Sequence, residues 1–259
     1  MVATSTQEKN QIHAIMLAAG TGSRLSKNNM AHPPKCLLEF EGKSLLHRHI
    51  EILTSLGILK LTIVIGYRCE EIIAEAQKFR EKILISFELN KEFTMGSLVS
   101  LWCTRKTLRS NYPILFMDAD VLYHRRIIKL LTSNTKNSVI PYDKVFDLGN
   151  EPVKLCLVNQ KAVEFGKSIN CKYDQIGEWP GFLKLSPLKA ATLADYLEEY
   201  INMGQTQLPC EEAIRKMLLN SSRDEFDYVD ITGIPWIEID FIEDLDKATF
   251  EILPAIKKY

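Results

Sequence analysis

The sequence predicts an α/β fold in which a mainly parallel sheet is doubly wound, with helices on both of its faces. Three observations support this prediction. Short apolar runs alternate with segments of helical spacing four times within about half of the chain. The first run ends in a glycine-rich turn, Gly20-Thr-Gly-Ser-Arg24, and a later run ends in Asp118-Ala-Asp120. Since parallel sheets bind ligands at the carboxyl ends of their strands, both groups are expected at one edge of the sheet.

The strand–helix repeats occupy the first half of the chain. Short continuous apolar runs fit strands that are buried on both faces, and apolar residues three and four positions apart fit helices. Ser44 is a candidate N-cap, and Gly57 is a candidate stop for the helix that follows it. The expected strands are residues 12–18, 60–65, 83–89 and 113–117, and the expected helices are residues 44–56, 69–80, 98–108 and 125–131.

The pattern changes after Val139. Residues 153–158 and 162–165 predict a hairpin around the polar turn 159–161. Ser186 followed by Pro187 is typical of a helix start. The remaining expected elements are strands at 181–185 and 236–241 and helices at 186–200, 211–219 and 243–252.

Composition limits the classes of function. The chain has 259 residues, of which 46% are hydrophobic and 25% charged, enough to bury one sizeable core. The formal net charge of −1 argues against a nucleic-acid partner. The first apolar run is too short to cross a bilayer, and the six cysteines show no metal-ligand spacing. We therefore expect a cytoplasmic protein without membrane insertion; a homo-oligomer stays possible.

The glycine-rich turn is the strongest functional signal. Glycines allow a ligand to approach the backbone closely, and successive N–H groups in such a turn can bind an anion. The spacing matches neither the G-x-x-x-x-G-K-[ST] loop nor the G-x-G-x-x-G loop. A simple strand-exit turn is the alternative, but Arg24 and the nearby Pro34-Lys35 favour a polyphosphate site.

Two pairs of carboxylates are candidate metal ligands. Asp118 and Asp120 follow an apolar strand, and Glu238 and Asp240 lie on one face of an expected strand. Carboxylates suit a hard divalent cation. A solvated turn or helix cap is the alternative for the first pair, and the solvent side of an edge strand is the alternative for the second.

The segment from Leu17 to Leu25, LAAGTGSRL, together with Pro34-Lys35, resembles the signature of the nucleotidyltransferase superfamily that activates sugar phosphates and other phosphorylated alcohols. The resemblance covers about residues 12–253, and residues 26–33 depart from it. It implies a Rossmann-like sheet of the GT-A-like nucleotidyltransferase type with a small acceptor-side extension. It also implies a nucleoside triphosphate and Mg²⁺, with release of pyrophosphate.

Four further segments resemble the CTP-using branch of phosphocholine and aminoethylphosphonate cytidylyltransferases. They are residues 93–101, 179–186, 209–215 and 235–244. The resemblance implies transfer of CMP from CTP to phosphocholine, phosphoethanolamine or 2-aminoethylphosphonate. The alternatives are a sugar-1-phosphate nucleotidylyltransferase, a GT-A glycosyltransferase and a non-catalytic nucleotide sensor. One domain is expected over 1–259, with residues 1–138 as its nucleotide-binding half and 139–259 as its acceptor-binding half.

The resemblance also implies roles for single residues. Arg24 and Lys35 would be catalytic, and Asp120 and Asp240 would hold the metal with help from Glu238. Trp179, Phe182 and Trp236 are candidates for an aromatic wall around a choline group, with a place in the core as the alternative; Glu211 and Glu212 are the alternative contacts for a primary ammonium. The residues expected to bind the nucleotide are Leu17, Ala18, Ala19, Gly20, Thr21, Gly22, Ser23, Asn90, Gly96 and Ser97, and those expected to bind the acceptor are Lys154, Lys167, Trp179 and Glu211.

Overall fold

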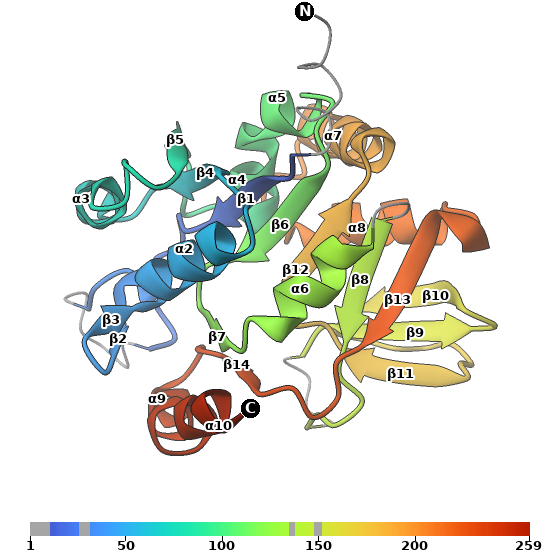
Figure 1. The fold of residues 1–259 in the computed structure, drawn as a ribbon. Helices are drawn as coiled ribbons and strands as arrows, with labels where there is room; N and C mark the ends of the chain where they lie inside the picture. The colour runs from blue at the N-terminus through green and yellow to red at the C-terminus, as the bar shows by residue number, and fades with distance from the viewer. Residues whose placement is uncertain (1–10, 26–31, 135–137, 148–151) are drawn as a thin grey trace, which may run out of the picture.

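The computed structural model describes residues 11–25, 32–134, 138–147 and 152–259. Its centre is a seven-stranded sheet with the strand order β13-β8-β12-β6-β1-β4-β5 (Figure 1). All strands are parallel except β12, which is antiparallel to both of its neighbours. The strands are β1 (His13–Leu17), β4 (Lys60–Ile65), β5 (Leu84–Leu89), β6 (Ile114–Asp118), β8 (Ser138–Tyr142), β12 (Phe182–Leu185) and β13 (Phe226–Asp230). This confirms the predicted mainly parallel α/β fold.

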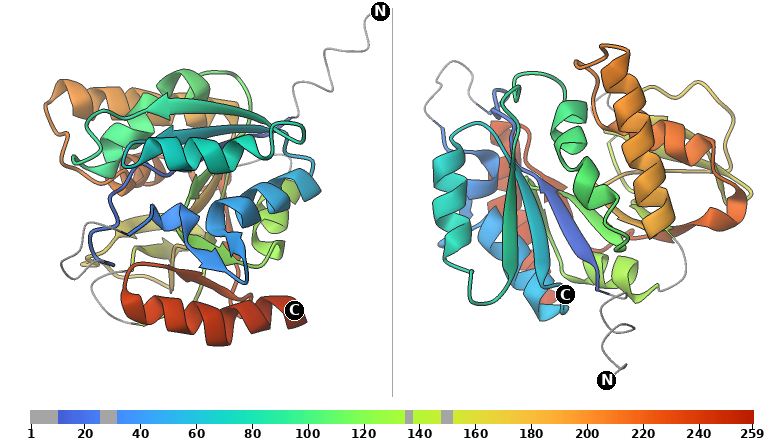
Figure 2. Two further views of the ribbon diagram at one scale, coloured as in Figure 1. Left: turned by 90° about the vertical axis from the view of Figure 1, so that its left-hand side faces the viewer. Right: turned by 90° about the horizontal axis from the view of Figure 1, so that it is seen from above.

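Helices cover both faces of this sheet (Figure 2). Side chains alternate along β1, so that Ala14 and Met16 pack on one helical layer and Ile15 packs on the other. The two resulting cores are almost fully apolar, which explains why the strands appear in the sequence as continuous apolar runs. The first layer comprises α2 (Leu45–Ser55), α3 (Cys69–Gln77) and α6 (Arg126–Ser133), and the second comprises α4 (Ser97–Cys103), α5 (Arg105–Leu108), α7 (Pro187–Asn202) and α8 (Glu211–Leu219).

A three-stranded antiparallel sheet lies beside the central sheet (Figure 1). Its strands β9 (Lys154–Val158) and β10 (Lys161–Gly166) form the predicted hairpin, and β11 (Gln175–Glu178) pairs with the other edge of β9. The turn residues Asn159 and Gln160 have φ values of 51° and 60°, which a tight two-residue hairpin turn requires.

A third core forms between short hairpins and the C-terminal helices. It includes Leu25, Phe40, Leu122, Ile239 and Leu253. Here β14 (Trp236–Glu238) pairs with β7 (Val121–Tyr123), which closely follows β6 in the chain, so two segments distant in the sequence meet near the carboxyl end of β6. The elements are η1 (Lys35–Leu37), β2 (Glu39–Phe40), β3 (Lys43–Ser44), β7 (Val121–Tyr123), β14 (Trp236–Glu238), α9 (Ile242–Lys247), the π-helical η3 (Ala248–Ile252) and α10 (Leu253–Lys258), with η2 (Arg223–Glu225) elsewhere.

Some predicted elements break or end earlier than expected. The expected helix at 98–108 is interrupted at Thr104, whose hydroxyl donates to the carbonyl of Leu101. The expected strand at 236–241 ends at Glu238, because the N–H groups of Asp240 and Phe241 turn to the Asp244 carboxylate. A side chain at the start of α9 thus replaces the ladder hydrogen bonds that would continue the strand.

The helix expected at 243–252 also takes another form. It begins one residue earlier as α9, passes through the π-helical η3 and continues as α10. Pro254 is the second residue after η3, and its missing N–H cannot continue an α-helical ladder. Within the described residues, no helix combines the length and apolar character needed to span a membrane.

Candidate active site

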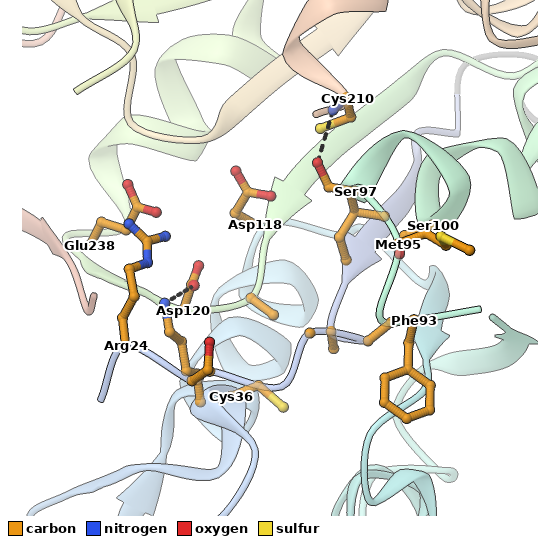
Figure 3. A pocket seen from close by; sticks show the side chains of 18 of the residues that line it. Arg24, Cys36, Phe93, Met95, Ser97, Ser100, Asp118, Asp120, Cys210 and Glu238 are labelled. Carbon is orange, nitrogen blue, oxygen red and sulfur yellow. Dashed lines mark hydrogen bonds and ion pairs between the residues drawn. The ribbon is translucent and has the colours of Figure 1, made fainter. Parts of the chain in front are cut away.

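A cavity of about 310 Å³ opens where β1 and β6 end. Its two ends differ in chemistry (Figure 3). Arg24, Asp120 and Glu238 lie at one end, and Phe93 and Met95 lie at the other. The cavity therefore has one charged end and one end that suits a flat or apolar group.

The turn after β1 forms one wall of the cavity. The N–H groups of Gly20, Thr21 and Gly22 donate to no acceptor in the described part of the chain. Gly22 has a φ of 63°, and a Cβ there would lie 2.8 Å from His32 Cε1 and 3.1 Å from Lys35 Cγ. Gly22 is thus required by the backbone and by its neighbours, whereas Gly20 has open space and leaves room for a ligand.

Three carboxylates meet at the charged end. Asp120 follows β6, while Glu238 ends β14 and Asp240 follows it. The ribbon of β7 and β14 brings them together, because Glu238 pairs with Val121 and the Ile239 N–H donates to the Asp120 carbonyl at 2.9 Å. Oxygens of the three side chains lie within 4.8 Å of one another.

Two cations already contact these carboxylates. Lys35 Nζ lies 3.0 Å from Asp120 Oδ2 and 2.6 Å from Asp240 Oδ1. Arg24 Nη1 lies 3.0 Å from Asp240 Oδ2. The Lys35 side chain is 13% exposed and that of Arg24 is 46% exposed, so Lys35 is the more enclosed of the two.

The crowding of charge shifts several pKa values. Burial alone would lower the pKa of Lys35, but the adjacent Asp120 and Asp240 raise it above its ordinary value. Burial, with the charges of Asp120 and Asp240, raises the pKa of Glu238 to about 8. Burial and the charge of Asp120 also raise the pKa of Asp118. The site thus holds more acidic groups than its two cations can fully stabilise as anions.

The residues at this point fit a divalent metal ion. Every candidate donor is a carboxylate oxygen, the ligand that hard cations prefer. Burial and the charges of Asp120 and Asp240 raise the pKa of Glu238, and a bound cation would offset both effects. Asp120, Glu238 and Asp240 would hold the ion, whereas Asp118 lies outside this group.

Two further cavities extend from the charged end. A small one of about 70 Å³ shares Arg24, Glu211 and Glu238 with the first cavity and adds Lys167 and Trp179. A larger one of about 440 Å³ shares Glu238 with both. The three cavities therefore follow one another, with the carboxylate group between the first and the last. We call the last the acidic cavity; it is lined by Asp143, Val145, Phe146, Asp147, Pro152, Glu178, Trp236, Ile237, Glu238, Asp240, Phe241, Asp244 and Lys247.

The acidic cavity combines aromatic surface with negative charge. Asp143 accepts hydrogen bonds at 2.9 Å from the Trp236 indole and from the Val145 N–H, which orients the tryptophan ring. No described residue gives the Glu178 carboxylate a hydrogen bond or ion pair. Burial, with the charges of Asp143 and Asp147, raises the pKa of Glu178 to about 7.

Some predicted nucleotide-binding residues line the first cavity and others do not. Asn90 is buried; its side chain donates to Ser100 Oγ and accepts from the Glu92 N–H. It therefore holds the segment between β5 and α4 in place and does not line the cavity. A Cβ on Gly96 would lie 2.0 Å from the Leu208 carbonyl oxygen, which gives that glycine a packing role. Thr21 also lies outside the lining, which includes the predicted Leu17, Ala18, Ala19, Gly20, Gly22, Ser23, Arg24, Lys35, Ser97, Asp120 and Glu238.

The predicted acceptor residues divide in the same way. Lys167, Trp179 and Glu211 line the small cavity. Lys154 is buried and donates to the Lys167 carbonyl at 2.8 Å, so it holds the Lys167 backbone in place. Sequence motifs alone could not tell which of the two lysines lines the cavity, because the difference between them is their burial in the folded protein.

The three aromatic residues expected to form one wall lie in different places, so that prediction is wrong. Phe182 is fully buried in the core. Trp179 is 4% exposed, stacks on Phe116 and donates its indole N–H to the Phe182 carbonyl. Of the three, Trp236 alone lines the acidic cavity, and its half-buried ring also packs against the core under the first helical layer.

The structure adds cavity residues that motif analysis did not assign. Phe93, Met95 and Ser100 line the end away from the carboxylates, and Cys36 and Cys210 also line the cavity. Phe93 and Ser100 fall within a segment that carried the family resemblance, and Met95 is 37% exposed despite its apolar side chain. The available sequence signal was the place of all three residues within the segment 93–101.

The chain is similar to known cytidylyltransferases. The chain is 25% identical over 257 residues to the CTP:phosphoglutamine cytidylyltransferase of Campylobacter jejuni, covering 91% of this chain and 98% of that protein. It is 30% identical over 131 residues to the choline-phosphate cytidylyltransferase of Streptococcus pneumoniae, covering 50% and 54% of the two chains. The solved inositol-1-phosphate CTP transferase from T. maritima superimposes with a TM-score of 0.76 at 20% identity, covering 96% and 97% of the two chains, and shows the same fold.

The family assignment rests on the first half of the chain. Residues 14–156 match the model of the MobA-like NTP transferase domain, and this range contains the glycine-rich turn, Lys35 and Asp120. Because the match spans more than half of the chain, the protein belongs to the MobA-like NTP transferase family and is a nucleotidyltransferase.

Proposed function

We propose that this protein is a cytidylyltransferase that transfers CMP from CTP to a small phosphorylated amino alcohol or to an aminophosphonate and releases pyrophosphate. Phosphocholine, phosphoethanolamine and 2-aminoethylphosphonate are the proposed acceptors. The row of three cavities around one carboxylate group is the observation that supports this most directly. The names of all three relatives described above include CTP or cytidylyl transfer, which favours CTP as the nucleotide.

The first cavity suits a nucleoside triphosphate. Its charged end offers Arg24, Lys35 and the open N–H groups of the turn to the phosphates. Its other end offers Phe93 and Met95 to the base. The α-phosphorus then comes to lie beside Asp120 and Glu238, at the border with the small cavity.

The chemical step needs no dedicated general base. An acceptor phosphate oxygen, anionic near neutral pH, attacks the α-phosphorus in line, and the bond to the β-phosphate oxygen breaks as pyrophosphate leaves. Arg24 and Lys35 balance the charge that develops on the phosphates. Mg²⁺ held by Asp120, Glu238 and Asp240 would supply further charge neutralisation and orient the phosphates.

The acceptor phosphate fits the small cavity. Lys167 and Arg24 both line it, and Trp179 closes one side. The buried Lys154 ammonium donates to the Lys167 carbonyl and so holds the backbone that carries the Lys167 side chain. An acceptor phosphate held there lies between the α-phosphorus in the first cavity and the acidic cavity beyond.

The remainder of the acceptor would enter the acidic cavity. Glu178 lacks a partner among the described residues, and the face of Trp236 can receive a cation. An ammonium or trimethylammonium group would offset the charges that raise the pKa of Glu178. This environment favours an acceptor with a cationic head over a neutral sugar.

Pyrophosphate release tests the proposal. The purified protein is assayed with CTP and Mg²⁺ against phosphocholine, phosphoethanolamine, 2-aminoethylphosphonate, inositol phosphate and glucose-1-phosphate, with UTP, ATP and GTP as nucleotide controls. We expect turnover with CTP and a cationic acceptor. Turnover only with glucose-1-phosphate or inositol phosphate would contradict the acceptor class, and turnover only with another nucleotide would contradict the use of CTP.

A further inference from the structure

Lys35 occupies the space between two proposed metal ligands. Its ammonium contacts Asp120 Oδ2 at 3.0 Å and Asp240 Oδ1 at 2.6 Å. Arg24 contacts the second oxygen of Asp240 at 3.0 Å. Both oxygens of Asp240 are therefore engaged by protein cations, although Asp240 is one of the three carboxylates that converge to form the candidate metal site.

A metal ion cannot join this arrangement without a rearrangement. A divalent cation among these carboxylates would lie within a few ångströms of the Lys35 ammonium and would be repelled by it. It would also compete with that ammonium for the same oxygens of Asp120 and Asp240. The protein's own cation thus lowers the affinity of the site for a metal ion.

The Lys35 side chain can also extend into the first cavity. Its residue begins η1 and lines the first cavity beside the glycine-rich turn. The Cγ of Lys35 lies against Gly22, where the missing side chain leaves space for the aliphatic stem. Rotation about the side-chain bonds can carry the ammonium from the carboxylates to a triphosphate bound along the turn.

We propose that Lys35 acts as a latch on the metal site: it blocks metal binding in the nucleotide-free protein and releases the carboxylates when a triphosphate draws its ammonium away. The latch rests on the proposed function, since it assumes a metal-dependent transfer from a nucleoside triphosphate. It makes metal and nucleotide binding mutually favourable. The triphosphate draws away the ammonium that repels the metal ion, and the metal ion neutralises the carboxylates that repel the triphosphate. Metal then enters together with the nucleotide and is not stored in the empty site.

Mn²⁺ binding to the nucleotide-free protein tests the latch. Free Mn²⁺ is followed by electron paramagnetic resonance at pH 8 for the wild type, Lys35→Gln and Lys35→Met. We expect both variants to bind Mn²⁺ at least tenfold more tightly than the wild type, because either removes the ammonium. Lys43→Gln is the matched control: Lys43 forms an ion pair with Glu51 away from the cavity, at 2.8 Å, and its loss should leave Mn²⁺ affinity unchanged.

A second measurement uses the wild type alone. Adding CTP without an acceptor should raise Mn²⁺ affinity strongly in the wild type and less in Lys35→Gln, where the latch is already absent. Equal Mn²⁺ affinity of wild type and both folded Lys35 variants, judged by circular dichroism, would overturn the latch while leaving the proposed function intact. Absence of Mn²⁺ binding in every protein, with or without CTP, would overturn the metal site and the latch together.

Discussion

Lys35 and Arg24 carry the positive charge of the candidate site, but they are held differently. Lys35 is enclosed and contacts Asp120 and Asp240, whereas Arg24 is more exposed and contacts Asp240. Replacing either residue with alanine should lower kcat by about 10²–10³-fold, the usual effect of losing one preorganised charge donor. Steady-state pyrophosphate release measures this, with Lys43→Ala as the control. Near-normal turnover of Lys35→Ala would remove Lys35 from the catalytic group.

Glu178 is the residue that should recognise the acceptor. Its carboxylate faces the acidic cavity without a partner among the described residues. Glu178→Gln keeps the shape and removes the charge, so the KM for a cationic acceptor should rise by roughly tenfold, equal to about 1.4 kcal/mol, with the KM for CTP unchanged. Glu81→Gln, at a site with an 86% exposed side chain, is the control. A parallel rise in the KM for CTP would place Glu178 in the nucleotide site instead.

Glu178 should also make stability depend on pH. Its pKa of about 7 in the folded protein exceeds the ordinary value of 4.5, so between these values the folded state keeps a proton that the unfolded chain has lost. The free energy of unfolding therefore falls as pH rises through this range. Glu178→Gln should raise Tm at pH 8 by roughly 2–4 °C for each kcal/mol of relieved repulsion and should leave Tm unchanged near pH 4. A calorimetric gain of equal size at both pH values would show a cause other than ionisation.

At the scale of elements, helix caps were the most reliable sequence signals. Ser44 caps α2 by accepting from the His47 N–H at 3.0 Å, and Ser186 caps α7 in the same way. Ser44 also donates to Glu75 Oε1 at 3.0 Å, so its hydroxyl joins α2 to α3. These caps were predictable because each depends on residues close in sequence.

Removing the α2 cap should destabilise the fold. Ser44→Ala should lower the free energy of unfolding by about 1 kcal/mol or more, because it leaves the start of α2 uncapped and removes the link to Glu75. Urea unfolding followed by circular dichroism measures the change. Ser55→Ala, an exposed position in the last turn of the same helix, is the control. Equal stability of the two variants would show that the cap contributes little.

Several strands escaped prediction for physical reasons. β8 contains Pro141, and a proline argues against a central strand because it lacks the N–H of a ladder hydrogen bond. In the structure β8 pairs with β12 only at Val139, so Pro141 does not need to donate to that strand. β11 has the sequence QIGE, with too few apolar residues to give a pattern. β7 has only three residues. Long apolar runs were predictable, whereas strands defined by their partners were not.

At the scale of the whole molecule, the site depends on pairing between distant segments. Asp120 and Asp240 are 120 positions apart in the sequence and meet because β14 pairs with β7. Local patterns suggested each acidic pair separately, and only the family resemblance joined them. The acidic cavity could not be predicted at all, because its lining comes from β11, β14, α9 and the segment after β8.

Ligand binding should therefore stabilise the whole fold, since the three carboxylates and the two cations come from elements at both ends of the chain. CTP with Mg²⁺ at one hundred times its dissociation constant adds about 2.7 kcal/mol, which corresponds to a rise in Tm of roughly 5–10 °C. Mg²⁺ alone should give almost no rise, because Lys35 holds the carboxylates, and excess EDTA should abolish pyrophosphate release. Scanning fluorimetry with CTP, Mg²⁺ and both together measures the shifts in Tm, with ATP as the nucleotide control, and the pyrophosphate assay measures the effect of EDTA. If Mg²⁺ alone shifts Tm as much as Mg²⁺ and CTP together, Lys35 does not hold the carboxylates against the metal ion. If ATP shifts Tm as much as CTP, the end of the cavity that holds Phe93 and Met95 does not select the cytosine base.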